Sequence, residues 1–159
     1  MRLYHGSNVE VRNPRLLRSD RRLDFGPGFY LTSSLEQASR WAILSARRRR
    51  KGSPFVTVYE FDERLLDEFD TLGFTGATVD WLDYIAANRS GEPLGDDYDI
   101  VFGPVTDDAT MPTLNGFFAG IYTTEETLKR LLPQKLKDQY AFRTQRAIDA
   151  LTCIEVIRP

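Results

Sequence analysis

The sequence contains one cysteine and one histidine, and this scarcity excludes several kinds of site. Cys153 has no partner for an internal disulfide, and a cysteine-based zinc site needs more thiolates than one. His5 alone cannot make a multi-histidine metal centre. We therefore expect no bound metal, and the low cysteine content fits a reducing, cytoplasmic setting best.

Long apolar segments are also missing. No run approaches the roughly 18 consecutive apolar residues that a membrane-spanning helix needs, and residues 1–5 lack the apolar core of a signal peptide. We therefore expect no membrane segment. The chain has 159 residues, of which 42% are hydrophobic and 28% charged, so a single globular domain over 1–159 is expected.

The common motifs of nucleotide-binding and hydrolytic enzymes do not occur. The chain has no GxGxxG and no GxxxxGK[ST], which argues against a Rossmann dinucleotide fold and a P-loop. It also has no GxSxG and no HExxH, so a serine hydrolase of the nucleophile-elbow type and a zinc protease are not indicated.

Charge is distributed unevenly along the chain, although the net charge is only −2. Residues 1–54 hold 12 Lys and Arg against 4 Asp and Glu, whereas residues 55–108 hold 2 against 14. The basic third could attract phosphates, or the two segments could neutralise each other in the fold. The sequence leaves both interpretations open.

The predicted elements mix strands and helices without regular alternation, which favours an α+β fold over a doubly wound α/β fold. Capping-box spacing at Ser34 and Gln37, and again at Thr123 and Glu126, predicts two helix starts. Helices are also predicted at 80–88 and 144–151, and residues 12–28 form a long loop. Strands are predicted at 3–4, 29–32, 55–61, 100–102, 139–142 and 153–157.

His5 lies at the predicted end of the first strand, followed by Gly6 and Ser7. Glycine allows a ligand to approach the backbone closely, and a planar carboxamide could be bound by that backbone and by the Ser7 hydroxyl. The histidine could then hydrogen-bond a ribose hydroxyl. The alternative is a structural histidine that caps the end of a strand.

Tyr30 follows a flexible segment that contains Gly26, Pro27 and Gly28. The loop backbone could lie against a ligand while the aromatic ring offers a face for stacking. The alternative is a core aromatic residue in a half-buried strand.

These two segments, YHGS and GFYLT in this order, resemble the ADP-ribosyltransferase superfamily in the His-Tyr-Glu branch of diphtheria-type toxins and poly(ADP-ribose) polymerases. The chain also resembles an uncharacterised bacterial family of such enzymes, often encoded beside a small partner in the manner of a toxin and its antitoxin. The resemblance covers most of 1–151. Its further segments are residues 37–42, 81–89, 98–105 with Asp107-Asp108, and 138–142.

The resemblance implies a split β-sheet core with a few surrounding helices, and NAD as co-substrate. His5 would hold the NAD ribose, Gly6 and Ser7 the nicotinamide amide, and Tyr30 would stack on the nicotinamide ring, with Gly28 beside it. The implied activity is mono-ADP-ribosyl transfer by a bacterial toxin to a macromolecular acceptor, either protein or nucleic acid. A small antitoxin protein is an implied partner.

The sequence departs from this branch at its third motif, where Gln139 stands at the position of the expected glutamate. An amide can hydrogen-bond a ribose hydroxyl but brings no negative charge. If Gln139 fills that catalytic position, its strand is expected beside the strand of His5, with the amide in the same cleft. The alternatives are an NAD glycohydrolase, in which water is the acceptor, and a non-catalytic module that binds NAD, ADP-ribose or a protein.

Several further residues carry two interpretations each. The five arginines of 12–22 could rim the cleft, hold the pyrophosphate and steer an anionic acceptor, or they could pair with the acidic segment 62–70. Asp107-Asp108 could orient a substrate or cap a turn, and Arg89 could bind a phosphate or form a salt bridge. Trp81 and Tyr84 are expected in the core, and Arg47 to Lys51 at a solvated helix end.

Overall fold

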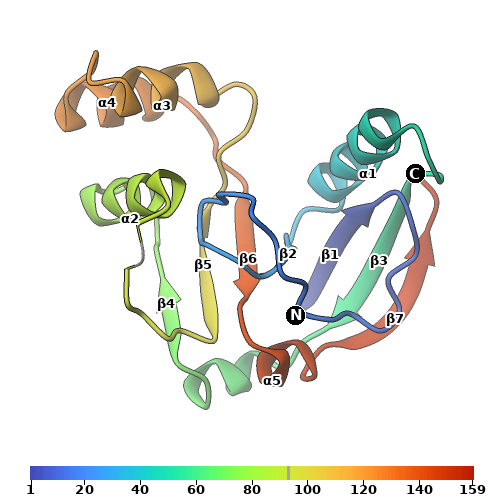
Figure 1. Cartoon of the computed structure of the whole chain (residues 1–159). Helices are drawn as coiled ribbons and strands as arrows, with labels where there is room; N and C mark the ends of the chain where they lie inside the picture. The colour runs from blue at the N-terminus through green and yellow to red at the C-terminus, as the bar shows by residue number, and fades with distance from the viewer. Residues whose placement is uncertain (93) are drawn as a thin grey trace.

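The computed structural model describes residues 1–92 and 94–159, which fold around two β-sheets (Figure 1). The first sheet has the order β1-β3-β7, with all neighbours antiparallel. Its strands are β1 (Arg2–Ser7), β3 (Phe55–Glu60) and β7 (Thr152–Ile157).

The second sheet has the order β2-β6-β5-β4, in which only β4 and β5 are parallel. It meets the first sheet at one bridge, where Tyr4 and Thr32 exchange backbone hydrogen bonds of 2.8 and 3.0 Å. Strands β1 and β2 therefore lie side by side at the centre of the molecule. The strands of this sheet are β2 (Phe29–Leu31), β4 (Thr71–Gly73), β5 (Ile100–Pro104) and β6 (Asp138–Phe142).

The helices are divided between the two sheets, as Figure 1 shows. Helix α1 (Leu35–Arg49) packs on β1 and β3, whereas α2, α3 and α4 lie together at one end of the second sheet. The expected α+β class is confirmed, with two sheets and five α-helices in the described part of the chain. The remaining helices are α2 (Val79–Ser90), α3 (Met111–Phe118), α4 (Thr124–Leu131), α5 (Gln145–Ile148) and the 3₁₀ turn η1 (Glu63–Asp67).

The start of α1 follows the predicted capping pattern only in part. The Ser34 hydroxyl accepts from the Gln37 N–H at 3.2 Å, as an N-cap serine should. The Gln37 side chain does not close the capping box; its amide donates to the Asp138 carbonyl at 3.1 Å. The first turn of α1 is thereby attached to the start of β6, which fixes the position of the helix relative to the second sheet.

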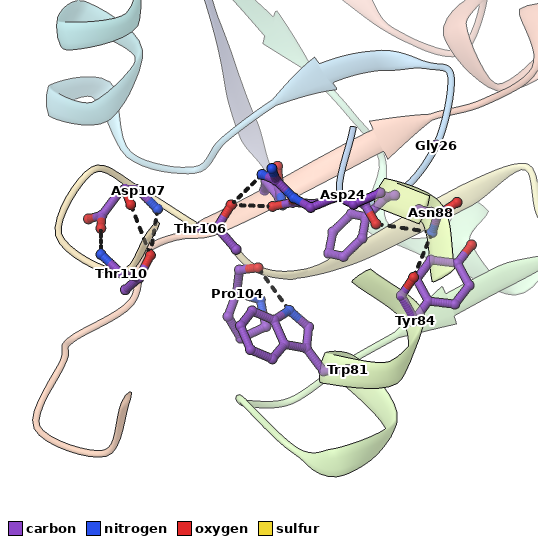
Figure 2. A network of polar contacts seen from close by, with 12 residues as sticks. Asp24, Gly26, Trp81, Tyr84, Asn88, Pro104, Thr106, Asp107 and Thr110 are labelled. Carbon is purple, nitrogen blue, oxygen red and sulfur yellow. Dashed lines mark hydrogen bonds and ion pairs between the residues drawn. The ribbon is translucent and has the colours of Figure 1, made fainter. Parts of the chain in front are cut away.

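Two large apolar clusters form the core: the first joins side chains from both sheets, and the second packs on the second sheet. Trp81 is fully buried in the second cluster, and its indole N–H donates to the Pro104 carbonyl at 3.0 Å (Figure 2). The prediction that Trp81 belongs to the core is confirmed, and the partly buried Tyr84 packs against the same cluster. The first cluster includes Leu3, Phe29, Leu31, Tyr59, Phe61, Phe142 and Ile148.

The structure differs from the sequence prediction at several elements. Strand β1 continues through Gly6 to Ser7, beyond the predicted end, because both residues pair with β3. Helix α5 covers only four of the eight residues predicted as helix at 144–151, because the chain turns toward β7 after it. The prediction lacked the short strand β4 and helix α3. No helix among the described residues is long and apolar enough to span a membrane.

Candidate functional site

A cleft with a volume of about 890 Å³ opens beside the junction of the two sheets. One wall is the exposed side of α1, and the opposite wall is built by the loops after β5 and before β6. The cleft is lined by His5, Gly6 and Ser7 of β1, Tyr30 of β2, several residues between Glu36 and Arg49 of α1, Arg89, Thr106 to Asp108, and Lys135 with Lys137.

His5 and Tyr30 meet in this cleft and contact each other. The Nδ1 atom of His5 lies 2.8 Å from the Tyr30 carbonyl oxygen, which can only accept, so Nδ1 carries the proton. Burial lowers the pKa of His5, and the hydrogen bond to Tyr30 opposes this only in part. The imidazole is therefore neutral at pH 7, and its Nε2 atom is a hydrogen-bond acceptor.

The Tyr30 hydroxyl is bound to the loop that precedes its own strand. It accepts from the Phe25 N–H at 3.0 Å and donates to the Gly26 carbonyl at 2.6 Å. Burial raises the pKa of Tyr30 far above its ordinary value, so the phenol stays neutral. Both hydrogen-bonding functions of the hydroxyl are used by the protein. Tyr30 is partly buried against the second core cluster, as the core-aromatic alternative predicts, and it lines the cleft as well.

The predicted glycines have different surroundings. Gly6 lines the cleft beside Ser7, but a Cβ there would lie 2.0 Å from the Ala38 carbonyl oxygen of α1. The close approach of α1 to β1 therefore requires glycine at position 6, whatever ligand binds. Gly28 does not line the cleft. A Cβ added at Gly28 would lie 3.1 Å from the Phe142 carbonyl oxygen, so this side of the glycine faces β6.

The prediction that the strand of Gln139 lies beside the strand of His5 is wrong. Gln139 is on β6, whose neighbours are β2 and β5, so the strand of Tyr30 separates it from β1. Its side chain is buried and does not line the cleft. The amide instead donates to the Asp24 carboxylate at 3.1 Å.

Asp24 is the centre of a polar network directly behind the cleft wall (Figure 2). The carboxylate is 5% exposed and accepts from Arg89 Nε at 2.6 Å and from the Thr106 hydroxyl at 2.5 Å. Arg89 also donates to Thr106 at 3.2 Å. Of the two readings of Arg89, the salt bridge is thus present, although Arg89 lines the cleft as well.

The position of Asp24 is also fixed from its other side. The Asn88 side-chain amide, on α2, donates to the Asp24 carbonyl at 3.0 Å, as Figure 2 shows. Asp24 directly precedes Phe25 and Gly26, to which the Tyr30 hydroxyl is bound. Gln139 is thus connected to Asp24 by a hydrogen bond, and the backbone leads from Asp24 to Phe25 and Gly26. Further hydrogen bonds connect these two residues to the Tyr30 hydroxyl and the Tyr30 carbonyl to His5.

The two acids after β5 have separate roles. The Asp107 carboxylate accepts from the N–H groups of Ala109 and Thr110 at 2.9 and 3.0 Å, which confirms its reading as a turn cap before α3. Asp108 is exposed on the cleft wall. Both acids line the cleft, and their negative charge disfavours an anionic group of a ligand next to this wall.

The arginine loop reaches the cleft with only one of its five side chains. Arg21 lines it, whereas Arg12 pairs with Glu10 at 3.0 Å and Arg22 lines a smaller cavity of about 480 Å³ beyond Gly26. Within 1–92 and 94–159, no arginine of this loop forms an ion pair with the acidic segment 62–70. The expectation that the loop rims the cleft is confirmed for Arg21 alone.

Sequence reasoning missed the contributions of α1 and of the loop before β6. Trp41 and Arg40 line the cleft from the middle of the helix, and Lys135 and Lys137 face them from the opposite wall. The available signal was helical spacing, since Arg40, Leu44 and Arg48 recur every four residues. In the described ranges, no group of three or more His, Cys, Asp or Glu residues could hold a metal ion.

Comparison with known proteins gives one result. No curated protein and no solved structure matches the chain. The family described as "Protein of unknown function (DUF3990)" matches residues 1–153, which is nearly the whole sequence. The chain therefore belongs to the DUF3990 family.

Proposed function

We propose that this protein is an NAD-dependent mono-ADP-ribosyltransferase. The observation that carries the proposal is the pairing of His5 and Tyr30 in one cleft, where Nδ1 of the histidine bonds the tyrosine backbone at 2.8 Å. These residues came from two separate motif segments whose order resembles the two halves of a nicotinamide site. The junction of the two sheets at Tyr4 and Thr32 is in keeping with the split-sheet core that the resemblance implies.

The nicotinamide end of NAD would bind between β1 and Tyr30. Tyr30 lines the cleft and its hydroxyl is held by residues 25 and 26, so its ring would be the part that stacks on nicotinamide. Ser7 and the backbone at Gly6 would bind the carboxamide, and the unprotonated Nε2 of His5 would accept from a ribose hydroxyl. Arg21 or the cationic side of α1 would contact the pyrophosphate.

The reaction itself is a displacement at the ribose. An acceptor oxygen or nitrogen bonds the ribose C1 as the bond from C1 to nicotinamide breaks; nicotinamide leaves neutral with the electron pair, and the acceptor loses its proton to water. The developing cation on the ribose needs negative charge close by. Gln139 has none, but its amide holds Asp24, and we assign the buried carboxylate of Asp24, behind the cleft wall, as the source of that charge.

The test is incubation of the purified protein with NAD labelled on the adenylate, with and without cell lysate. We expect release of nicotinamide and label in macromolecules that survive denaturation. His5→Ala and Tyr30→Ala should abolish both signals, whereas Asp83→Ala, an exposed residue of α2 away from the cleft, should not. Tyr30→Ala should weaken NAD binding by roughly 1–3 kcal/mol through lost stacking and burial.

Two alternatives give different products in this assay. An NAD glycohydrolase releases nicotinamide but labels no macromolecule, and a non-catalytic module binds NAD or ADP-ribose without releasing nicotinamide. The role of a bacterial toxin, a small antitoxin partner and a cytoplasmic setting belong to the same proposal. Co-expression of the gene with a neighbouring small gene would test them, since a toxin arrests growth only when expressed alone.

A further inference from the structure

The cleft contains more positive charge than a dinucleotide requires. Seven Lys and Arg side chains line it. Arg89 pairs with Asp24, and across residues 1–92 and 94–159 none of the other six forms an ion pair. Three acids line the same cleft, of which Asp107 already accepts from two backbone N–H groups. NAD carries one negative charge on each phosphate of its pyrophosphate, so the acids and NAD together do not balance the six cations, and positive charge remains in the cleft when NAD binds. The six are Arg21, Arg40, Arg48, Arg49, Lys135 and Lys137.

Half of this charge lies along α1 in a regular pattern. Arg40, Leu44 and Arg48 are spaced four residues apart and share one face, with Arg49 next to it. From Arg40 to Arg48 the helix rises about 12 Å, a length over which one nucleic-acid strand presents several phosphates. The row is exposed and turned into the cleft.

An aromatic ring lies beside this row of cations. Trp41 follows Arg40, lines the cleft and is partly exposed, and it belongs to none of the apolar core clusters. A flat ring next to unpaired cations is the combination by which proteins bind single strands, with bases stacked on the ring and phosphates held by the cations. An acidic polypeptide would use the cations but not the ring.

We propose that the acceptor is a single-stranded nucleic acid, bound along α1 with a base on Trp41 and its phosphates on Arg40, Arg48 and Arg49. This inference rests on the proposed function, because it assigns the acceptor of that reaction. A single strand is favoured over a duplex because its bases are free to stack on the ring and to reach the ribose near His5 and Tyr30, whereas paired bases are held within the helix.

The first experiment measures binding by fluorescence anisotropy with labelled oligothymidylate and oligouridylate of about 20 nucleotides, which exceeds common single-strand site sizes. The variant Arg40→Gln/Arg48→Gln/Arg49→Gln should bind at least about ten-fold more weakly at 0.1 M salt, with a shallower dependence of log affinity on log salt by about 2. The matched control is Arg47→Gln/Arg50→Gln/Lys51→Gln, which removes the same amount of charge at the end of α1 and just after it, from residues outside the cleft. The two oligomers distinguish DNA from RNA.

The second experiment uses intrinsic fluorescence, because the chain has two tryptophans. Trp81 is fully buried, so quenching by an added oligomer reports contact at Trp41. We expect quenching in the native protein and in the control variant. Trp41→Phe should remove the quenching while binding stays within a few-fold, and Trp41→Ala should bind about ten-fold more weakly than Trp41→Phe.

Several outcomes would overturn the inference: equal losses in the two triple variants, displacement of the oligomer by a polyglutamate peptide at equal charge, tighter binding of the matching duplex, or binding without quenching. Nicotinamide release from NAD, measured without any oligomer, separates this inference from the proposed function. Release without oligomer binding overturns the acceptor and leaves the transferase. If the oligomer binds with the expected variant pattern but no nicotinamide is released, the transferase function is overturned. The oligomer is then no acceptor either.

Discussion

At the scale of single residues, the cleft depends on one histidine whose protonation is coupled to folding. Burial lowers the pKa of His5 below its ordinary value of 6.5, so the unfolded chain binds this proton at a higher pH than the folded chain. Below about pH 6.5 the unfolded state therefore holds more protons, and stability falls as the pH falls. Above that pH, His5 adds no pH dependence.

The corresponding prediction concerns the free energy of unfolding between pH 7 and pH 5. We expect the native protein to lose stability across this interval with a slope of at most about 1.4 kcal/mol per pH unit. Because His5 is the one histidine in the sequence, His5→Gln should make the profile nearly flat there. Urea titrations at closely spaced pH values measure this, and an unchanged slope in His5→Gln would assign the effect to carboxylates.

A second prediction at this scale concerns Asp24, whose charge balances Arg89 behind the cleft. Asp24→Asn leaves the Arg89 cation without its partner, at a cost in stability of about 3 kcal/mol. Under the proposed function, it should lower kcat for nicotinamide release at least about ten-fold and change KM little, since a nearby uncompensated cation opposes the transition state more than NAD binding.

The double variant Asp24→Asn/Arg89→Gln distinguishes these two effects of Asp24. Removing the orphaned cation should recover much of the lost stability, because the buried charge is no longer unpaired. It should not restore kcat if the carboxylate itself stabilises the cationic ribose. Full recovery of both quantities would make the role of Asp24 purely structural.

At the scale of elements, the contact between β1 and α1 determines the shape of the cleft. Gly6→Ala would put a Cβ 2.0 Å from the Ala38 carbonyl, and both partners are backbone atoms in regular elements that cannot move independently. We expect destabilisation of at least about 2 kcal/mol by chemical denaturation. Gly76→Ala is the matched control, since nothing lies within 4 Å of its new Cβ, and it should be neutral or slightly stabilising.

The same elements show what could be predicted from the sequence. Capping residues and β-branched runs are local signals, so α1, α4 and β3 were predicted close to their true bounds. His5 and Tyr30 were grouped by their motif context, and they do meet. The surroundings of Gln139 could not be predicted, because its contact with Asp24 joins residues 115 positions apart and depends on the order of strands in the sheet. The three-residue strand β4 has no alternating pattern to identify it.

At the scale of the whole molecule, the two sheets meet where β1 and β2 lie side by side, at the bridge between Tyr4 and Thr32 and the hydrogen bond from His5 to the Tyr30 carbonyl. On β6, the Asp138 carboxylate accepts from the Thr32 hydroxyl at 3.0 Å and from the Ser33 N–H at 2.8 Å, as well as from the Ser33 hydroxyl. Asp138 therefore fixes the segment that connects the Tyr30 strand to α1.

The prediction for this junction is a local one. Asp138→Ala should leave the Thr32 and Ser33 donors without their acceptor and cost about 2 kcal/mol. Hydrogen exchange should become faster at the amides of Tyr4 and Thr32, which form the bridge, before it changes in the centre of β3. Asp83→Ala, on the exposed side of α2, is the control. Uniform acceleration over all strands would instead indicate a global loss of stability.

The order of the strands has a consequence for folding during synthesis on the ribosome. The first sheet is completed by β7, and in the second sheet β6 lies between β2 and β5. Both strands come from residues after 137, so a nascent chain that has exposed only β1 to β5 cannot pair β2 within its sheet. Because such long-range pairing is slow and occurs late, the cleft forms only when synthesis has passed the last strands, and shorter ribosome-bound fragments should lack it.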